Sequence, residues 1–480
     1  MKYDNDAKQM KYEVLTRVAK LAYDEKLDNE HLYNVPFEII PGRTPHYRCC
    51  VYKEREIIRE RVQLAIGNNI NPDSDEVISV LPAACEGCPI NRFTVTTNCQ
   101  RCMAKKCVAA CPFGAISISG ERAYIDQSKC KECGRCANAC PYNAIADTLR
   151  PCKRSCPTKA LTISDDKIAK IEYEKCISCG SCVAACPFGA ISDYSSIVQI
   201  IEEIKSDKKV YAMFAPAIEG QFGKANVGMI KSAIKKLGFD GVYEVALGAD
   251  AVSEHESHDV EEAILAGKKI TTSCCPAFVA MIRKLFPNLT EYISNTATPM
   301  AATARYIRAE HPDAVTVFIG PCMAKKNEIK VEKDTADYVM TAEELVAVFD
   351  AMGINPENEE CDNEQDGSVY GKIFARTGGV AESVLKALEE RGCDLDVSVL
   401  KCAGADECRK ALLMLSSGKL KEDMIEGMAC AGGCIAGPAS VETLANVIKN
   451  RQVLLKQADD RTITGNTEAH GYDKIDMNRN

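Results

Sequence analysis

The sequence predicts an α/β domain over residues 208–456, preceded by a cysteine-rich α+β array over residues 85–190 and a helical segment over residues 1–84. Three observations support this order: apolar residues at helical intervals near the N-terminus, cysteines in short repeats, and β-like runs that then alternate with amphipathic segments. At 480 residues the chain is too long for one ordinary core, so several domains are expected. Residues 457–480 are polar and are expected to form a loose tail.

Composition excludes several classes of protein. Hydrophobic residues make up 46% of the chain and charged residues 26%, which is typical of a folded globular protein. No apolar run approaches the ~18 residues of a membrane span, and the N-terminus lacks the apolar core of a secretory signal. We therefore expect a cytoplasmic protein with no membrane or nucleic-acid partner. Thiols stay reduced in that compartment, so 27 cysteines indicate metal or redox chemistry.

The N-terminal segment contains two expected helices, Met10–Tyr23 and Tyr52–Ile66, with apolar residues at helical intervals. Cys49 and Cys50 precede the second helix. Adjacent cysteines do not easily ligate one cluster together, so these two are interpreted as structural or reactive thiols of unknown role. No function is assigned to this segment.

The array repeats a four-cysteine motif in which three closely spaced thiolates ligate one four-iron cluster and the last, before proline, ligates the other cluster of a pair. Two runs match it in full: Cys130-x2-Cys133-x2-Cys136-x3-Cys140-Pro141 and Cys176-x2-Cys179-x2-Cys182-x3-Cys186-Pro187. A third run has two added residues, Cys99-x2-Cys102-x4-Cys107-x3-Cys111-Pro112. Cys152-x3-Cys156-Pro157 is the second half only. These repeats predict bacterial-ferredoxin-like 4Fe–4S domains.

Crossed ligation assigns the thiols to clusters. Three sets follow: Cys99, Cys102, Cys107 and Cys140; Cys130, Cys133, Cys136 and Cys111; Cys176, Cys179, Cys182 and Cys156. Cys152 and Cys186 remain, and the only unused pair nearby is Cys85-x2-Cys88-Pro89. We therefore predict three clusters and, as a hypothesis, a fourth that uses Cys85, Cys88, Cys152 and Cys186. Between Cys99 and Ala160 there are eleven Lys or Arg and four Asp or Glu, which either offset the anionic clusters or steer an acidic electron carrier.

The C-terminal half alternates strands and helices. The expected strands are Val210–Phe214, Val242–Ala246, Lys269–Thr272, Val315–Gly320 and Val397–Lys401. The expected helices are Val227–Leu237, Asp250–Ala266, Val279–Phe286, Pro299–Glu310, Ala342–Met352 and Ala405–Ser416. Thr377-Gly378-Gly379 lacks the lysine of a phosphate loop and is interpreted as a tight turn. Cys361, Cys393, Cys402 and Cys408 lack cluster spacing and are interpreted as small buried hydrophobes.

Three cysteine motifs directly follow β-like runs, where ligand sites gather in an open α/β sheet. They are Thr272-Ser273-Cys274-Cys275-Pro276, Gly320-Pro321-Cys322-Met323-Ala324-Lys325-Lys326-Asn327-Glu328 and Gly427-Met428-Ala429-Cys430-Ala431-Gly432-Gly433-Cys434. If they converge, they offer five thiols, one more than a four-iron cube needs. The glycine pair of the last motif is expected to give the inorganic centre room.

Behind the cysteine array, these motifs resemble the signature of the [FeFe]-hydrogenases, and the resemblance covers roughly residues 85–440. It implies a two-lobed catalytic domain that holds an H-cluster. Cys275, Cys322, Cys430 and Cys434 would ligate its 4Fe–4S part, and Cys434 would also bridge to a two-iron subcluster that carries CO, cyanide and a dithiolate amine. Lys325 would donate to a cyanide, Cys274 would relay protons to the amine, and Met428 would line the two-iron site.

The rest of the proton path is less determined by the resemblance. Ser294 aligns with the family's serine. The two acids are Glu256 and Asp259 by one count, whereas another count gives Glu254, and a solvated helix N-terminus would explain all three equally well. Glu328 is expected to hold Lys325 or its loop rather than to titrate.

The resemblance implies reversible oxidation of H2 to protons, with electrons passed to or from ferredoxin, and maturation by dedicated assembly proteins. An H2-sensing homologue and an iron–sulfur scaffold without the two-iron site are the alternatives. The sequence departs from the family's usual pattern at Pro276-Ala277-Phe278, at Gly320 and at Ala436-Gly437-Pro438. These changes resemble the group B branch and alter the surroundings of the ligands rather than the ligands themselves.

Overall fold

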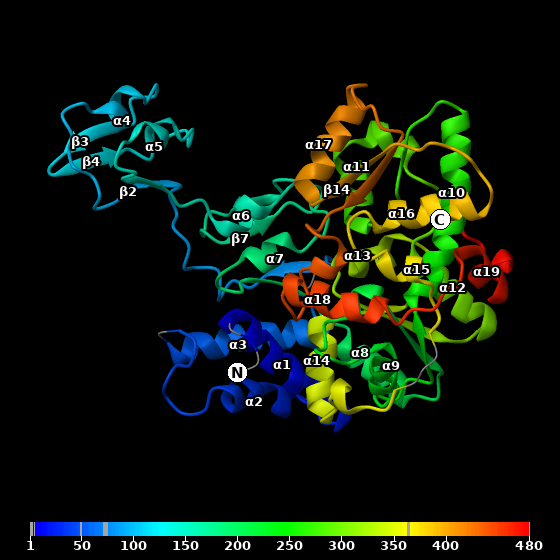
Figure 1. Ribbon diagram of the computed structural model, residues 1–480. Coiled ribbons are helices and arrows are strands. Elements are labelled where there is room, and N and C mark those ends of the chain that lie inside the picture. The colour runs from blue at the N-terminus through cyan, green and yellow to red at the C-terminus, as the bar shows by residue number, and fades with distance from the viewer. Residues whose placement is uncertain (1–2, 4, 49, 71–74, 362–364, 480) are drawn as a thin grey trace.

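A computed structural model describes residues 3, 5–48, 50–70, 75–361 and 365–479 (Figure 1). Cys49 lies outside the described residues. Three helices form the N-terminal unit: α1 (Asp6–Tyr23), α2 (Asn29–Ile39) and α3 (Val51–Ala65). The sequence predicted α1 and α3 but not α2, which contains Pro36. Helix α1 packs on α14 (Ala342–Met352) of the C-terminal half, so this unit shares a core with the α/β domain.

Two ferredoxin-like modules follow, built from short antiparallel strand pairs and short helices. The first comprises β2 (Phe93–Val95), α4 (Lys106–Ala109), β3 (Ile116–Ser119), β4 (Arg122–Ile125), α5 (Arg135–Ala139) and β5 (Ile145–Asp147). The second comprises β1 (Ile78–Val80), α6 (Pro151–Ser155), β6 (Leu161–Ile163), β7 (Ala169–Ile171), α7 (Ser181–Ala185) and β8 (Ile191–Asp193). The first module projects away from the body of the molecule, whereas the second lies against it (Figure 1).

The C-terminal half has two lobes, each built on a parallel sheet. The first sheet has the order β10-β9-β12-β13, with β9 (Val210–Phe214), β10 (Gly241–Glu244), β12 (Val315–Gly320) and β13 (Tyr338–Thr341). The second has the order β11-β15-β14, with β11 (Ile270–Thr271), β14 (Val399–Ala403) and β15 (Met424–Met428). This confirms the α/β prediction for this half of the chain.

Helices cover both sheets. They are α8 (Ile197–Lys205), α9 (Val227–Lys235), α10 (Val245–Leu265), α11 (Pro276–Leu285), α12 (Pro299–Glu310), α13 (Ala324–Val331), α15 (Val369–Ile373), α16 (Gly379–Glu390), α17 (Ala405–Ser416) and α18 (Leu444–Leu455). The expected strand Val242–Ala246 is too long, because α10 begins at Val245. No helix of the described residues is long and apolar enough to cross a bilayer.

The expectation of a loose C-terminal tail is wrong. Residues 463–469 form α19 (Ile463–Ala469), which packs against α10 and α16, and a short 3₁₀ turn buries Tyr472. Ala297 N–H donates to the Met477 carbonyl at 2.7 Å, which ties the end of the tail to the segment before α12. The prediction failed because the tail is polar on average, although a few of its apolar side chains are buried: Ile463, Tyr472 and Met477.

Candidate functional site

A cavity lies between the two lobes, where strand ends from both sheets meet. Strands β11 and β15 end directly before the Cys274 and Cys430 motifs, and β12 ends before Cys322. The cavity is lined by Ala, Pro, Val, Met and Phe side chains together with thiols and Lys325. The three predicted motifs therefore converge on one mostly apolar site.

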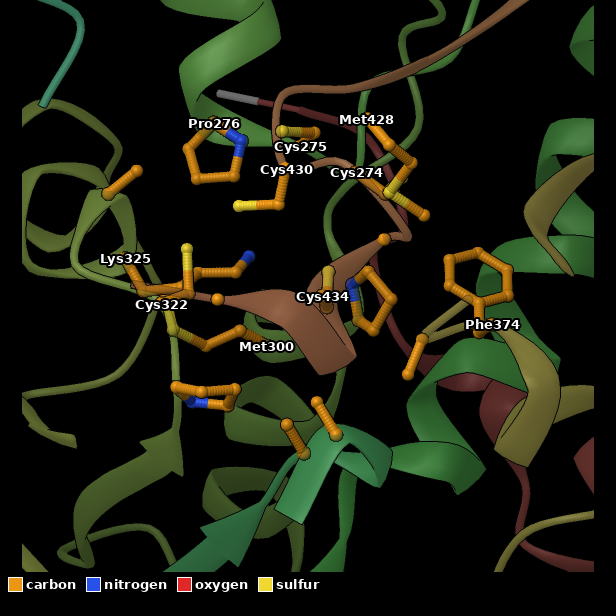
Figure 2. Close-up of a pocket in the computed structure, with 18 of the residues that line it drawn as sticks. Cys274, Cys275, Pro276, Met300, Cys322, Lys325, Phe374, Met428, Cys430 and Cys434 are labelled. Atoms are coloured by element: carbon orange, nitrogen blue, oxygen red, sulfur yellow. The ribbon is translucent and has the colours of Figure 1, made fainter. Parts of the chain in front are cut away.

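Five thiols of the three motifs line this cavity, which we call the five-thiol site: Cys274, Cys275, Cys322, Cys430 and Cys434. Cys179 of the array lines it as well. Figure 2 shows Cys275, Cys322, Cys430 and Cys434 around one space, while Cys274 lies beside Met428. Burial raises the pKa of Cys322 to about 11, and the neighbouring Cys275 thiol adds to the rise. Burial and neighbouring thiols also hold the pKa values of Cys430 and Cys434 well above the usual range. Ionising these thiols together requires a positive partner in the cavity, which a metal cluster would supply.

Lys325 lies on α13, a helix that the sequence analysis did not predict. Its ammonium contacts the Glu328 carboxylate at 2.6 Å one turn along the helix. The Thr298 hydroxyl donates to the other Glu328 oxygen. Glu328 is 1% exposed, so this carboxylate fixes the position of Lys325 from within the protein, as the sequence interpretation expected.

Cys274 has a buried acid as its neighbour. Glu256 of α10 is fully buried, and it accepts the Ser273 N–H at 3.4 Å through Oε1. Its Oε2 atom is buried without a hydrogen-bond partner among the described residues. Burial raises the pKa of Glu256 to about 8 against the opposing effect of the Ser294 hydroxyl, and the Glu256 charge in turn raises the pKa of Cys274.

The structure separates the three candidate acids. Ser294 donates to Asp259 Oδ2 at 2.8 Å, which places Ser294 between Asp259 and Glu256. Glu254 instead accepts a hydrogen bond from Thr467 of the C-terminal segment and lines a different cavity. The count that yields Glu256 and Asp259 therefore selects the residues that lie together behind Cys274.

Gly433 of the glycine pair lines the cavity and also allows two loops to pack closely. A Cβ atom on Gly433, which has a φ of +89°, would lie 2.6 Å from the Thr377 nitrogen and 2.7 Å from the Ala375 oxygen. The expected room for an inorganic centre stays a prediction. In the Thr377-Gly378-Gly379 turn, the Gly378 N–H donates to the fully buried Glu426 at 2.6 Å, and the other two N–H groups donate to backbone carbonyls. These N–H groups therefore have protein acceptors, as a tight turn requires.

Some members of each predicted quartet lie near one another, as their effects on one another's pKa values indicate. In the first module, burial raises the pKa of Cys107 and of Cys136; the Cys140 charge adds to the rise for Cys107, and the Cys111 charge adds to the rise for Cys136. In the second module, the pKa of Cys176 is raised to about 11, first by burial and then by thiols that include Cys156.

The hypothetical fourth quartet also comes together. Burial raises the pKa of Cys152 to about 11, with further contributions from Cys186, Cys88 and Cys85. The long segment between Cys88 and Cys152 is the whole first module. Its two ends are held together because β2 pairs antiparallel with β5 and the Thr148 N–H donates to the Arg92 carbonyl at 2.6 Å.

Within the described residues, no group of three or more His, Cys, Asp or Glu side chains is arranged to hold a single metal ion. A four-iron cube spreads its ligands over four irons, so its thiols need not converge on one point.

Sequence reasoning missed the groups that contact the array thiols. The thiol before each proline of the motif accepts the N–H four residues later: Cys111 from Ala115 at 3.3 Å, Cys140 from Ala144 at 3.4 Å, Cys156 from Ala160 at 3.2 Å and Cys186 from Ala190 at 3.3 Å. The repeated alanine at that spacing is the signal that could have revealed them. Arg150, which is 6% exposed, also lies 3.9 Å from the Cys85 sulfur.

The array reaches the cavity through Cys179, which lines it together with Cys275. Burial raises the pKa of Cys179, and the Cys275 charge adds to that rise; Cys179 in turn contributes to the raised pKa of Cys430. A Cβ on the next residue, Gly180, would lie 2.6 Å from Pro438 and 2.8 Å from the Met323 sulfur, so the loop packs tightly on the cavity wall. One of the four quartets is thus directly adjacent to the five-thiol site.

Three protein families match three separate parts of the chain, all of them after residue 97. The family described as "Iron only hydrogenase large subunit, C-terminal domain" matches residues 208–438, a 4Fe-4S dicluster domain matches 98–144, and an LdpA Fe-S cluster-binding domain matches 146–197.

Among curated proteins, the periplasmic [Fe] hydrogenase large subunit of Nitratidesulfovibrio vulgaris is 30% identical over 65% of this chain and 85% of its own length. Iron hydrogenase 1 of Clostridium pasteurianum is 27% identical over 65% of this chain, which spans 64% of that relative. The NADP-reducing hydrogenase subunit HndD of Solidesulfovibrio fructosivorans is 26% identical, and this chain spans 52% of it.

A solved variant of the [FeFe]-hydrogenase HydA1 from Chlamydomonas reinhardtii has the same fold, with a TM-score of 0.50 and 22% identity over 58% of this chain and 94% of that one. The match over the α/β half, the iron–sulfur domains in front of it and the Nitratidesulfovibrio relative agree with the three motifs around the cavity. The chain belongs to the iron-only, or [FeFe], hydrogenase family.

Proposed function

We propose that the protein catalyses the reversible oxidation of H2 to protons and electrons at an H-cluster in the five-thiol cavity. The observation that supports this most is the convergence of Cys275, Cys322, Cys430 and Cys434 from two lobes, with Cys274 and Lys325 on the same cavity. Neither a plain electron carrier nor a scaffold needs a free thiol beside a buried acid there.

The donor set fits the group. Thiolates are the ligands of iron–sulfur clusters, and the remaining wall is apolar, which excludes water from a reactive metal site. Cys275, Cys322, Cys430 and Cys434 would hold the 4Fe–4S part, and Cys434 would also contact the two-iron subcluster with its CO, cyanide and dithiolate amine. When bound, that subcluster supplies the open metal position at which H2 is split.

The residues of the chain supply protons and orientation. The Cys274 thiol, whose pKa is held well above its usual range by burial, stays protonated and can pass a proton into the cavity. Glu256 and Ser294 lie behind it and can return a proton to it. Lys325, held by Glu328, places an ammonium where a cyanide can accept a hydrogen bond, and Met428 closes the wall beside Cys274.

We further propose that electrons pass through four 4Fe–4S clusters in the two ferredoxin-like modules, with Cys179 next to the cavity. A ferredoxin-type carrier is the proposed partner. Exposed cations on the first module favour an acidic protein there: Arg101, Lys105, Lys106, Lys131 and Arg135. The HndD relative is named as a subunit of an NADP-reducing hydrogenase, so an NADP-dependent partner subunit is the other possible electron carrier. Measuring whether the protein binds reduced ferredoxin or such a subunit distinguishes the two carriers.

The proposed compartment is the cytoplasm, and maturation proteins would supply the two-iron subcluster.

Infrared spectroscopy of protein produced with its maturation machinery tests the proposed function. We expect CO and cyanide stretching bands together with H2-dependent reduction of a viologen dye. Protein that shows the 4Fe–4S signals but neither CO nor cyanide bands would favour the scaffold alternative. Bands without turnover would favour a sensor.

Replacing Cys152 tests the fourth cluster. Cys152→Ala is expected to remove about four iron atoms per chain relative to the parent, because each cube contains four irons. Iron analysis of anaerobically purified protein measures this loss. Cys393→Ala is the matched control, since Cys393 is a half-buried thiol outside the four quartets. An iron content that is equal in the Cys152 and Cys393 variants would leave only three clusters in this region.

A further inference from the structure

A second cavity lies between α10 and the C-terminal segment. Figure 1 shows α19 and the C-terminus beside α10, and the two helices pack together. Its wall contains six acidic or histidine side chains, three from α10 and three from the C-terminal segment: Glu254, His255, His258, Glu468, Asp473 and Asp476. None of them belongs to the five-thiol site.

A hydrogen-bond chain leads from this cavity toward that site. His255 Nδ1 lies 2.9 Å from Thr296 Oγ1, and the Thr296 hydroxyl donates to Asp259 Oδ2 at 3.0 Å. Ser294 donates to the same Asp259 oxygen at 2.8 Å. Asp259 is thus the junction between the cavity side and the Ser294–Glu256–Cys274 side.

The direction of these bonds fixes the histidine tautomer. The Thr296 proton is used by the Asp259 carboxylate, so the Thr296 oxygen acts as an acceptor toward His255. His255 must then donate from Nδ1, which leaves the lone pair of its neutral ring on Nε2. A ring with a donor toward the interior and an acceptor at its other nitrogen is suited to taking up a proton on one side and releasing one on the other.

The C-terminal segment holds this arrangement in place. Asn478 forms an isolated bridge with Thr296, and Arg479 donates to the Ser273 carbonyl at 2.8 Å, next to Cys274. The Arg479 side chain is 8% exposed and also pairs with Glu332 at 3.0 Å. The segment therefore forms the cavity wall and tethers both ends of the hydrogen-bond chain.

We propose that this cavity is the mouth of the proton path and that His255 exchanges protons between cavity water and Asp259 through Thr296. The proposal rests on the proposed function. A proton from water binds Nε2, the Nδ1 proton moves to Thr296, and the Thr296 proton moves to Asp259. One proton enters and one leaves the ring, and no electron moves. The cavity around His255 is also lined by His258 and Glu254 of the same helix and by Glu468, Asp473 and Asp476 of the C-terminal segment, and these four carboxylates attract hydronium and protonated buffer.

The turnover of matured His255→Ala protein tests the relay. We expect kcat for H2 production to fall about 10²-fold, the low end for loss of a positioned acid–base group, with the infrared bands unchanged. Added imidazole should restore the rate in a saturable manner, and the solvent deuterium isotope effect should rise in its absence. His258→Ala, which alters a histidine of the same cavity outside the hydrogen-bond chain, should stay within about twofold of the parent.

A second variant and a measurement without turnover keep the test independent of the proposed function. Thr296→Val retains His255 but breaks the link, so its rate should fall without imidazole rescue. In ¹⁵N-histidine NMR of the unmatured protein, the His255 signal, assigned by its loss in His255→Ala, should show the Nδ1–H tautomer. An Nε2–H tautomer, or a His255→Ala rate equal to the parent's, would overturn the proposal and leave Asp259 in direct exchange with water. Failure of the proposed function would instead show as absent CO and cyanide bands in the parent.

Discussion

Replacement of Cys274 by alanine is expected to lower kcat for both H2 oxidation and H2 production by about 10²–10⁴-fold, the range for loss of a positioned general acid–base group. The reason is geometric. Cys274 lines the cavity, whereas the acids behind it, Glu256 and Asp259, do not line it. Without the thiol, the last proton transfer has no donor within the wall. Film electrochemistry or a viologen assay over a range of pH values measures the loss.

The CO and cyanide bands should remain in Cys274→Ala, because the proposed ligands are the other four thiols of the three motifs. Cys393→Ala provides the control for removal of a thiol elsewhere. Two results would refute the assignment in different ways. Parental turnover would mean that protons reach the cavity by another route, and loss of the bands would mean that Cys274 helps to bind the cluster.

The sequence could assign each array cysteine to a proposed cluster because the ligation rule of the motif is local and strict. The rule gave three quartets directly and the fourth by elimination. What it could not supply was the reason that Cys88 meets Cys152. That depends on β2 and β5, two three-residue strands that are 49 residues apart, closing the ends of an inserted module.

The strands around the site were predictable to different degrees. β9 and β12 are continuous apolar runs, and their observed bounds equal the predicted ones. β15 was missed as a strand, although it leads into the Cys430 motif, because Glu426 and Gly427 interrupt its apolar pattern. Glu426 is buried there because it holds the turn at Gly378 through a contact that only tertiary structure provides.

The residues of the proposed proton path also depend on tertiary contacts that the sequence does not reveal. Counting along the sequence left Glu254, Glu256 and Asp259 open, since all three lie on one helix. The three carboxylates point to different sides of the helix, which the sequence does not reveal. Glu256 is fully buried behind Cys274, whereas Glu254 contacts Thr467. The alternative of a solvated helix N-terminus does not apply, because α10 begins at Val245, nine residues before Glu254.

Replacement of Lys326 by methionine is expected to lower the free energy of local opening of α13 and α1 by about 3–5 kcal/mol, the cost of breaking a buried ion pair on one side. Lys326 is fully buried and lies 2.7 Å from Asp193 and 2.8 Å from Glu344. Burial alone would lower the pKa of Lys326, but these two carboxylates raise it, so the side chain stays charged. Methionine would leave both carboxylates without this cation.

The effect should extend beyond α13 because Asp193 is shared. It lies at the end of β8 in the second ferredoxin-like module, and it also contacts Lys11 of α1 at 2.7 Å. Hydrogen exchange measured by mass spectrometry resolves the opening of each segment separately, as a chain of several domains requires. Lys209→Met, which removes an exposed partner of Asp240, should leave the protection of α1 and α13 unchanged, because exposed ion pairs contribute little to stability.

The residue before Lys326 is Lys325, whose ammonium faces the five-thiol cavity. If Lys326→Met loosens α1 and α13 together, one buried lysine couples the N-terminal helices, the electron path and the loop that positions Lys325. The N-terminal unit would then have the role that its sequence alone did not reveal, which is to hold the cluster-binding loop from behind. Unchanged protection in α1 would instead confine the lysine's effect to α13 and leave residues 1–84 without that role.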